Sequence, residues 1–115
     1  MNIKTSNTIL NCKKWKETVA FYRDVLTLDV HFSNEWFVEF SLNSQARLSV
    51  AHQERSSVMN TDGRGITVCF QVDDAQIIHT HLTELETNPT PIQDLWESSM
   101  FYIRDPEGNR IEFWS

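Results

Sequence analysis

The sequence contains few cysteines, and this scarcity argues against one class of protein. Only Cys12 and Cys69 occur among its 115 residues, and each lies inside an apolar run. A secreted disulfide scaffold normally carries more cysteines than this and places them in loops. We therefore expect two reduced thiols in the protein core.

Positive charge and long apolar runs are also scarce. Lysine and arginine number 10 against 16 acidic residues, which gives a formal net charge of −6. Binding to a phosphate backbone needs clustered basic residues, so this balance argues against a nucleic-acid partner. No apolar stretch approaches the length of a membrane span, and the N-terminal segment has neither an h-region nor a small-residue cleavage site. We expect a cytoplasmic protein with no membrane partner.

An ordinary globular composition is present instead, with 40% hydrophobic and 23% charged residues. Residues 5–12 alternate as a strand, and residues 13–26 repeat apolar side chains at helical spacing. Three further extended runs follow, at residues 28–33, 35–42 and 46–53. The stripe on the predicted helix consists of Trp15, Val19, Tyr22 and Leu26.

The same order returns after the polar, glycine-bearing residues 54–65, which we interpret as a linker. A strand is predicted at residues 66–72 and a helix at residues 73–86, followed by three short strands. Asp73 or Asp74 supplies the N-cap of this helix, and Asn88-Pro89 ends it. The stripe on this helix consists of Ala75, Ile78, Leu82 and Leu85.

The two halves therefore repeat one βαβββ pattern at about sixty residues. A unit of that size buries only one face of its sheet beneath its helix, so the other face needs a partner. We predict an α+β fold in which two modules form a curved mixed sheet around a central cavity, with the helices outside.

Three stretches of the chain resemble one protein family. "TVAFYRDVLTLDV" (18–30) is similar to that family's first helix and second strand, and "FQVDDAQIIHTHLTEL" (70–85) to the start of its second module. "FYIRDPEGNRIEFW" (101–114) is similar to its closing hairpin. The chain is thus identified as a member of the vicinal oxygen chelate superfamily, which includes glyoxalase I, extradiol dioxygenases, and fosfomycin- and bleomycin-resistance proteins. The resemblance implies one domain, residues 1–115, built from the modules 1–53 and 66–115.

The segment "DPEGN" is interpreted as a turn and not as a catalytic loop. Asp105 opens it, Pro106 presets its backbone, and Gly108 takes the position where φ can be positive. The chain departs from the family pattern at two positions. Thr27 stands where the family usually has glycine after the first helix, and Lys14 stands where it often has an acidic helix cap.

Metal-using members of this family bind the ion at four inward positions. By register, those positions are Asn7, Ser49, Thr67 and Glu112 in this sequence. Only Glu112 is a competent ligand, because amide and hydroxyl groups are weak donors to transition metals. We therefore expect no metal and no cofactor. The four histidines are interpreted as solvated imidazoles, and they are His31, His52, His79 and His81.

Strand alternation predicts which side chains face the cavity and which pack beneath the helices. The predicted ligand-binding residues are Asn7, Phe37, Glu39, Arg47, Ser49, Thr67, Cys69, Tyr102, Arg104, Glu112 and Trp114. The same face carries Ile9, Asn11 and Gln71. The opposite, apolar face consists of Trp36, Val38, Phe40, Leu42, Leu48, Val50, Val68, Phe70, Ile103, Ile111 and Phe113.

Several functions are compatible with this cavity. The first hypothesis is a metal-free protein that binds a planar or amphiphilic small molecule, as bleomycin-resistance proteins sequester a drug. The second is a metal-independent enzyme with Glu112 as general base, assisted by Arg47 or Arg104. A metal-dependent lyase, isomerase or dioxygenase is the third. The polar face is also compatible with a filled module or dimer interface, in which Glu39 and Arg47 form a cross-strand ion pair.

The resemblance also bears on assembly. Members of the family often form dimers, some of them with modules exchanged between chains. We expect a homodimer here, with pairing of the modules within one chain or between chains left open, because a linker of a dozen residues permits both.

Overall fold

The computed structural model describes all residues, 1–115, and divides into two compact units, residues 1–61 and 62–115. The border between the units falls inside the segment interpreted as a linker. Neither helix has the length and apolar character needed to span a membrane.

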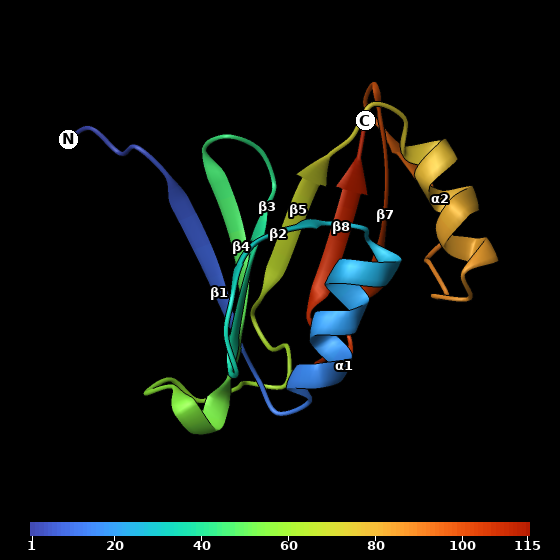
Figure 1. Ribbon diagram of the computed structural model, residues 1–115. Coiled ribbons are helices and arrows are strands. Elements are labelled where there is room, and N and C mark those ends of the chain that lie inside the picture. The colour runs from blue at the N-terminus through green and yellow to red at the C-terminus, as the bar shows by residue number, and fades with distance from the viewer. The chain divides into compact units, whose positions relative to one another are not determined.

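Unit 1 contains one mixed sheet and one helical segment (Figure 1). Its elements are β1 (Ser6–Cys12), α1 (Trp15–Ala20), the π-helical η1 (Phe21–Val25), β2 (Asp29–Ser33), β3 (Phe37–Ser41), β4 (Ala46–His52) and the 3-10 helix η2 (Gln53–Arg55). The strand order is β1-β4-β3-β2, with β1 parallel to β4 and the other pairs antiparallel.

Unit 2 repeats this topology. Its elements are β5 (Thr67–Gln71), α2 (Ala75–Glu84), β6 (Gln93–Leu95), β7 (Ser98–Arg104) and β8 (Arg110–Trp114). The strand order is β5-β8-β7-β6, again with one parallel pair, β5 and β8. The predicted α+β fold of two βαβββ modules is thereby confirmed.

The core of unit 1 lies between its helical segment and the apolar face of its sheet. The indole Nε1 of Trp15 donates a hydrogen bond to the Val50 carbonyl oxygen at 2.9 Å, and the ring centroids of Tyr22 and Phe40 lie 6.1 Å apart. Val38, Phe40, Leu48 and Val50 are buried, as the alternation predicts. Each such side chain stabilises the fold by about 2 kcal/mol.

The prediction of one regular helix over residues 13–26 is corrected by the structure. The α-helix ends at Ala20, and the amide of Leu26 then donates to the Phe21 carbonyl, a spacing of five residues. Phe21 and Tyr22, which are adjacent in sequence, are both buried, with their rings edge to face at 5.1 Å. The wider turn thus allows two neighbouring aromatic residues to contribute to the core.

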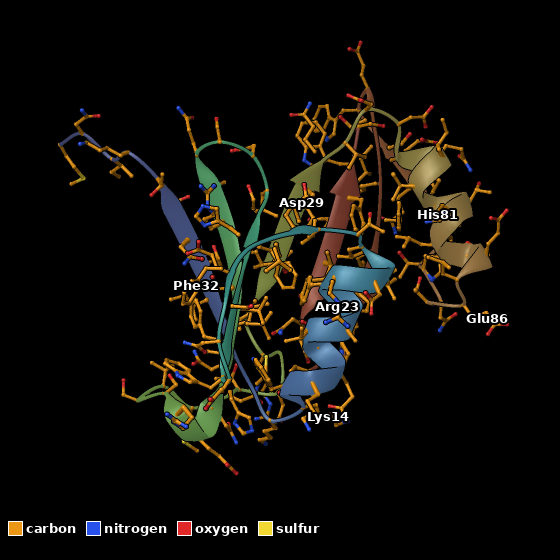
Figure 2. All side chains as sticks on the ribbon, in the orientation of Figure 1. Lys14, Arg23, Asp29, Phe32, His81 and Glu86 are labelled. Atoms are coloured by element: carbon orange, nitrogen blue, oxygen red, sulfur yellow. The ribbon has the colours of Figure 1, made fainter.

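The core of unit 2 is centred on stacked aromatic rings. The rings of Phe101 and Phe113 lie 5.3 Å apart, and His79 from α2 meets Phe101 edge to face at 4.9 Å. Leu82 is buried, but Leu85 is 44% exposed, so its predicted place on the buried stripe is wrong. The reason is that α2 ends at Glu84, before the Asn88-Pro89 stop signal, and Glu86 already has a positive φ of 60°. Figure 2 labels Glu86 just beyond the end of this helix.

The turn Asp105–Asn109 is closed by hydrogen bonds, and three of its residues, Asp105, Glu107 and Asn109, are buried. The Asp105 Oδ1 atom accepts from the amides of Glu107 and Asn109, both at 2.9 Å, and its Oδ2 atom accepts from Asn109 Nδ2 at 2.8 Å. Gly108 has φ +89°, which confirms the assigned role of this glycine. The turn fixes the β7–β8 register and therefore the face on which Glu112 lies.

Candidate functional site

Unit 1 presents a hydrogen-bonded polar cluster on the face of its sheet opposite Leu48 and Val50. Ser49 Oγ donates to Asn7 Oδ1 at 2.8 Å, and Asn7 Nδ2 donates to Glu39 Oε1 at 3.3 Å. The register supports this arrangement, because Glu39 and Ser49 are direct partners across β3 and β4. Three side chains that the sequence places on one face are thereby brought together.

Strand β2 adds a residue that sequence reasoning missed. The β2–β3 register shifts between Val30 and Phe32, and at this irregularity His31 Nδ1 forms a hydrogen bond with Glu39 Oε2. Figure 2 labels Phe32 on the same strand. Simple alternation cannot locate His31, because a bulge changes the face of the residues around it. His31 keeps 54% of its side-chain surface exposed, as expected of a solvated imidazole, and it also contacts the Glu39 carboxylate.

Arg47 lies beside this cluster but is held mainly by the backbone. Its Nη1 atom donates to the carbonyl oxygens of Asn43 at 2.8 Å and Ala46 at 3.2 Å. The distance from Arg47 Nε to Glu39 Oε2 is 3.9 Å, so the expected ion pair is present but long. Glu39 is thus a carboxylate with three polar neighbours, and its side chain keeps 21% of its surface exposed.

The remaining predicted residues of unit 1 differ in burial. Phe37 is half-buried, with its ring edge to face against Trp36 at 5.6 Å. Ile9 is 49% exposed. Asn11 Oδ1 is buried without a hydrogen-bond partner, while the Asn11 carbonyl accepts from Asn60 Nδ2 at 2.7 Å.

Unit 2 presents rows of paired side chains on the corresponding face. In one row Glu112 is the partner of both Cys69 and Tyr102. In the next row Arg110 is the partner of both Thr67 and Arg104. A third row consists of Gln71, Trp114 and Met100. Because register partners share a face, seven of the residues predicted to face the cavity lie together on this sheet.

Arg110 links these rows, and sequence reasoning missed it. Its guanidinium carbon lies 3.9 Å from the centroid of the Tyr102 ring, and its Nη2 atom donates to Glu112 Oε1 at 3.3 Å. Both contacts are favourable, since a guanidinium group stacks on aromatic faces and pairs with carboxylates. The signal was available, because Arg110 has the same parity as Glu112 and Trp114.

Arg104 also approaches the Tyr102 ring. Its guanidinium carbon is 5.5 Å from the Tyr102 centroid, and its Nη1 atom donates to the Gly108 carbonyl at 2.9 Å. Tyr102 therefore has two cationic groups within reach of its ring.

Cys69 is exposed, so the prediction of a core thiol holds for Cys12 alone. Partial burial and the neighbouring Glu112 carboxylate both raise the pKa of the Cys69 thiol above its usual range. A thiol that stays protonated at neutral pH is a poor nucleophile. Cys69 therefore contributes an uncharged thiol to this face.

His79 and His52 differ from the interpretation of the histidines as solvated imidazoles. His79 is half-buried, and its Nε2 atom lies 2.9 Å from the Thr90 carbonyl oxygen. His52 is half-buried as well, and its Nδ1 atom accepts from the Glu54 amide at 3.3 Å. Both have structural roles, whereas His81 is exposed.

The side chains at the family's four metal positions do not fit a divalent ion. The amide of Asn7 and the hydroxyl of Ser49 bond to each other, and Glu112 has a guanidinium group 3.3 Å from its carboxylate. A permanent cation at that distance competes directly with a metal ion. Thr67 offers only a hydroxyl group. Besides these positions, no cluster of three or more histidine, cysteine, aspartate or glutamate side chains is arranged to hold a metal.

Solved structures resemble this arrangement over nearly its whole length. A lactoylglutathione lyase from Agrobacterium tumefaciens is 26% identical, with a TM-score of 0.79, 94% of this chain covered and 90% of that chain. The oxidase ChaP-H2 is 20% identical, with a TM-score of 0.77 and coverages of 100% and 94%. A glyoxalase/bleomycin resistance protein from Catenulispora acidiphila is 14% identical, with a TM-score of 0.75 and 96% coverage of both chains.

Among curated proteins, none matches the chain. A family model does match, and it extends over residues 5–113, which contain every helix and strand except the last residue of β8. Together with the repeated strand order, this match shows that the chain belongs to the Glyoxalase/Bleomycin resistance protein/Dioxygenase superfamily.

Proposed function

We propose that the protein binds a small organic molecule without a metal ion, on the helix-free face of the unit 2 sheet. The observation that carries this proposal is the Tyr102 ring with Arg110 at 3.9 Å and Arg104 at 5.5 Å, beside Glu112 and Trp114. Aromatic side chains with a few polar groups are the usual lining of small-molecule sites.

Unit 1 presents a carboxylate on its own polar face. Glu39 is oriented by Asn7 and His31 and is half-buried, so a polar group of a ligand can approach it. That residues 1–115 form a single domain is also part of the proposal. An antibiotic is one candidate ligand, because a structurally similar protein is named a bleomycin resistance protein.

Tryptophan fluorescence tests the proposal, because Trp114 belongs to the proposed site. The protein is treated with a chelator and titrated with cationic glycopeptides and other planar drugs. We expect saturable quenching that Trp114→Phe abolishes and that Trp96→Phe, at the fully exposed end of a hairpin, leaves unchanged. Absence of quenching up to high micromolar ligand, with Tyr102→Leu indistinguishable from the unaltered protein, contradicts the proposal.

A metal-independent enzyme is the second candidate. Glu112 with Arg110 at 3.3 Å combines a carboxylate that can accept a proton with a cation that can stabilise an oxyanion. This role for Arg110 replaces the one assigned to Arg47 or Arg104 in the sequence. Turnover that is lost in Glu112→Gln, while ligand binding persists, would support the enzyme over the binding protein.

A metal-dependent lyase is the third candidate, since one similar structure is named a lactoylglutathione lyase. The donor set described above disfavours it. Stoichiometric zinc, nickel, manganese or iron in the purified protein, lost in Glu112→Gln, would establish it. We also propose a cytoplasmic homodimer, which light scattering at several concentrations would test.

A further inference from the structure

Basic residues in unit 2 are confined to a single place. Residues 62–115 contain ten acidic residues but only three basic ones, all arginines: Arg64, Arg104 and Arg110. All three line one pocket of about 480 Å³ in this unit. In a chain of net charge −6, such convergence of guanidinium groups points to an anionic ligand.

The sheet itself brings two of these arginines together. Arg104 and Arg110 are direct partners across β7 and β8, and Thr67 is the partner of Arg110 across β5 and β8. The two guanidinium groups and the Thr67 hydroxyl therefore share one face at one end of the sheet. Arg64 comes from the loop immediately before β5.

This loop is held against the DPEGN turn, so the pocket is preformed. Gly63 has φ +76°, and a Cβ atom added there would lie 2.3 Å from the Gly108 carbonyl carbon. No side chain fits at that distance, so the loop backbone packs directly on the turn. The turn in turn is fixed by the Asp105 hydrogen bonds.

Arg104 and Arg110 are not fully neutralised by their contacts. Arg104 contacts a backbone carbonyl and an aromatic ring, neither of which carries a net charge. Arg110 has one carboxylate partner at 3.3 Å, and its Nε atom is buried without a hydrogen-bond partner. Among the residues that line the pocket, three arginines stand against one carboxylate, that of Asp62.

We infer that this pocket binds the anionic group, a carboxylate or a phosphate, of the small molecule whose binding is proposed above, and the inference rests on that proposed function. Guanidinium groups recognise both anions by paired hydrogen bonds. A second hollow of about 390 Å³ shares Arg110 and is lined by Tyr102, Met100, Thr90 and Pro91. It receives the planar or apolar body of the same molecule. The ligand class is therefore a small aromatic or amphiphilic acid.

Small aromatic compounds of similar size, with and without a negative charge, test the inference. Benzoate, phenyl phosphate and the neutral benzamide are titrated into the full chain, and inorganic phosphate is titrated alone. Binding is measured by calorimetry and by the NMR signals of the Gly63 and Gly65 amides and the arginine Nε–H groups. We expect at least one of the two aromatic anions to bind about tenfold more tightly than benzamide, and the stronger of the two identifies the anion.

Variants locate the effect. Arg104→Gln and Arg64→Gln, made separately, should each weaken binding of the anion roughly tenfold, and Arg104→Lys should weaken it less. Arg23→Gln is the matched control, since it removes one positive charge from the surface of unit 1 (Figure 2). Circular dichroism verifies that each variant is folded.

The outcomes separate this inference from the proposed function. If benzamide binds as tightly as both anions, and the pocket variants behave like Arg23→Gln, the inference is overturned while the proposed function stands. If inorganic phosphate shifts the Gly63 and Gly65 signals in an Arg104-dependent manner but no organic probe or drug binds, the anion site stands and the proposed function falls. If no anion shifts these signals, the inference is overturned.

Discussion

The two units share one strand order but carry opposite chemistry on their polar faces. In unit 1 the centre is a carboxylate, Glu39, approached by an amide and an imidazole. In unit 2 the centre is an aromatic ring, Tyr102, approached by two guanidinium groups. The topology depends on the apolar face, which packs beneath the helix in both units, so the other face is free to diverge.

The units also differ in how their local structure is secured. Helix α2 is capped by Asp74, whose Oδ1 atom accepts from the amides of Gln76 and Ile77. Lys14, at the N-cap position of α1, provides no side-chain cap (Figure 2). The hairpin turn of unit 2 is closed by the buried Asp105, and that of unit 1 by the exposed Asn43. Unit 2 therefore has a side-chain cap on its helix and a buried side chain closing its hairpin turn, and unit 1 has neither.

The largest difference between the units should be the loss of unfolding free energy when the hairpin turn of each is weakened. Asp105→Ala removes three hydrogen bonds in a buried turn and should lower the free energy of unfolding by about 3 kcal/mol. Asn43→Ala removes two hydrogen bonds in an exposed turn and should cost about 1 kcal/mol. Urea unfolding followed by circular dichroism measures both. Equal costs would show that burial does not distinguish the turns.

Relief of backbone strain should have the next largest effect. Thr27 has φ +55°, a left-handed conformation that β-branched residues resist. Thr27→Gly should raise the free energy of unfolding by about 1 kcal/mol. Glu86→Gly, at φ +60° in unit 2, is the control, and it should gain less because glutamate is not β-branched. Thermal unfolding that ranks the two variants in reverse contradicts this explanation.

Adding an N-cap to α1 should reduce the difference in helix capping between the two units. Lys14→Asp should raise the free energy of unfolding by about 0.5 to 1 kcal/mol, because an aspartate can accept from the first helical amides and interacts favourably with the helix dipole. Lys4→Asp makes the same charge change outside any helix or strand. Both variants are measured by urea unfolding at low salt. No gain over Lys4→Asp would mean that the backbone at Lys14 does not permit a cap.

The smallest effect concerns the two thiols. Because the pKa of Cys69 is raised, a smaller fraction of this thiol is ionised at pH 8. Iodoacetamide at that pH should therefore modify Cys69 roughly several-fold more slowly than a free thiol. Glu112→Gln removes one cause of the raised pKa and should speed the reaction. Cys12, which is 0% exposed, should react only on unfolding. Mass spectrometry of both sites measures the rates, and a Cys69 rate equal to that of a free thiol contradicts the prediction.

Much of the fold was predictable because its signals are local. The alternation around Phe40 and Ile111, the cap at Asp74 and the glycine of the DPEGN turn all act within a few residues of chain. Leu85 and the regular helix through Phe21–Val25 were predicted wrongly. Helix ends and helix type depend on packing against the sheet, which periodicity does not encode.

The candidate site was less predictable. Alternation placed Glu39, Tyr102 and Glu112 on their faces, and the same rule would have placed Arg110. It could not place His31, because a bulge interrupts the strand, nor the exposure of Cys69, because that depends on what covers the strand.

The sequence alone determined the repeated βαβββ order and the family, since these follow from short-range pattern and residue chemistry. Only the tertiary structure decided which charges meet. Arg64, Arg104 and Arg110 come from three different segments, namely the loop before β5, the end of β7 and the start of β8. The pairing of β7 with β8 and the contact of Gly63 with Gly108 bring them to one pocket. The physical reason is that register is a property of paired strands and not of one strand.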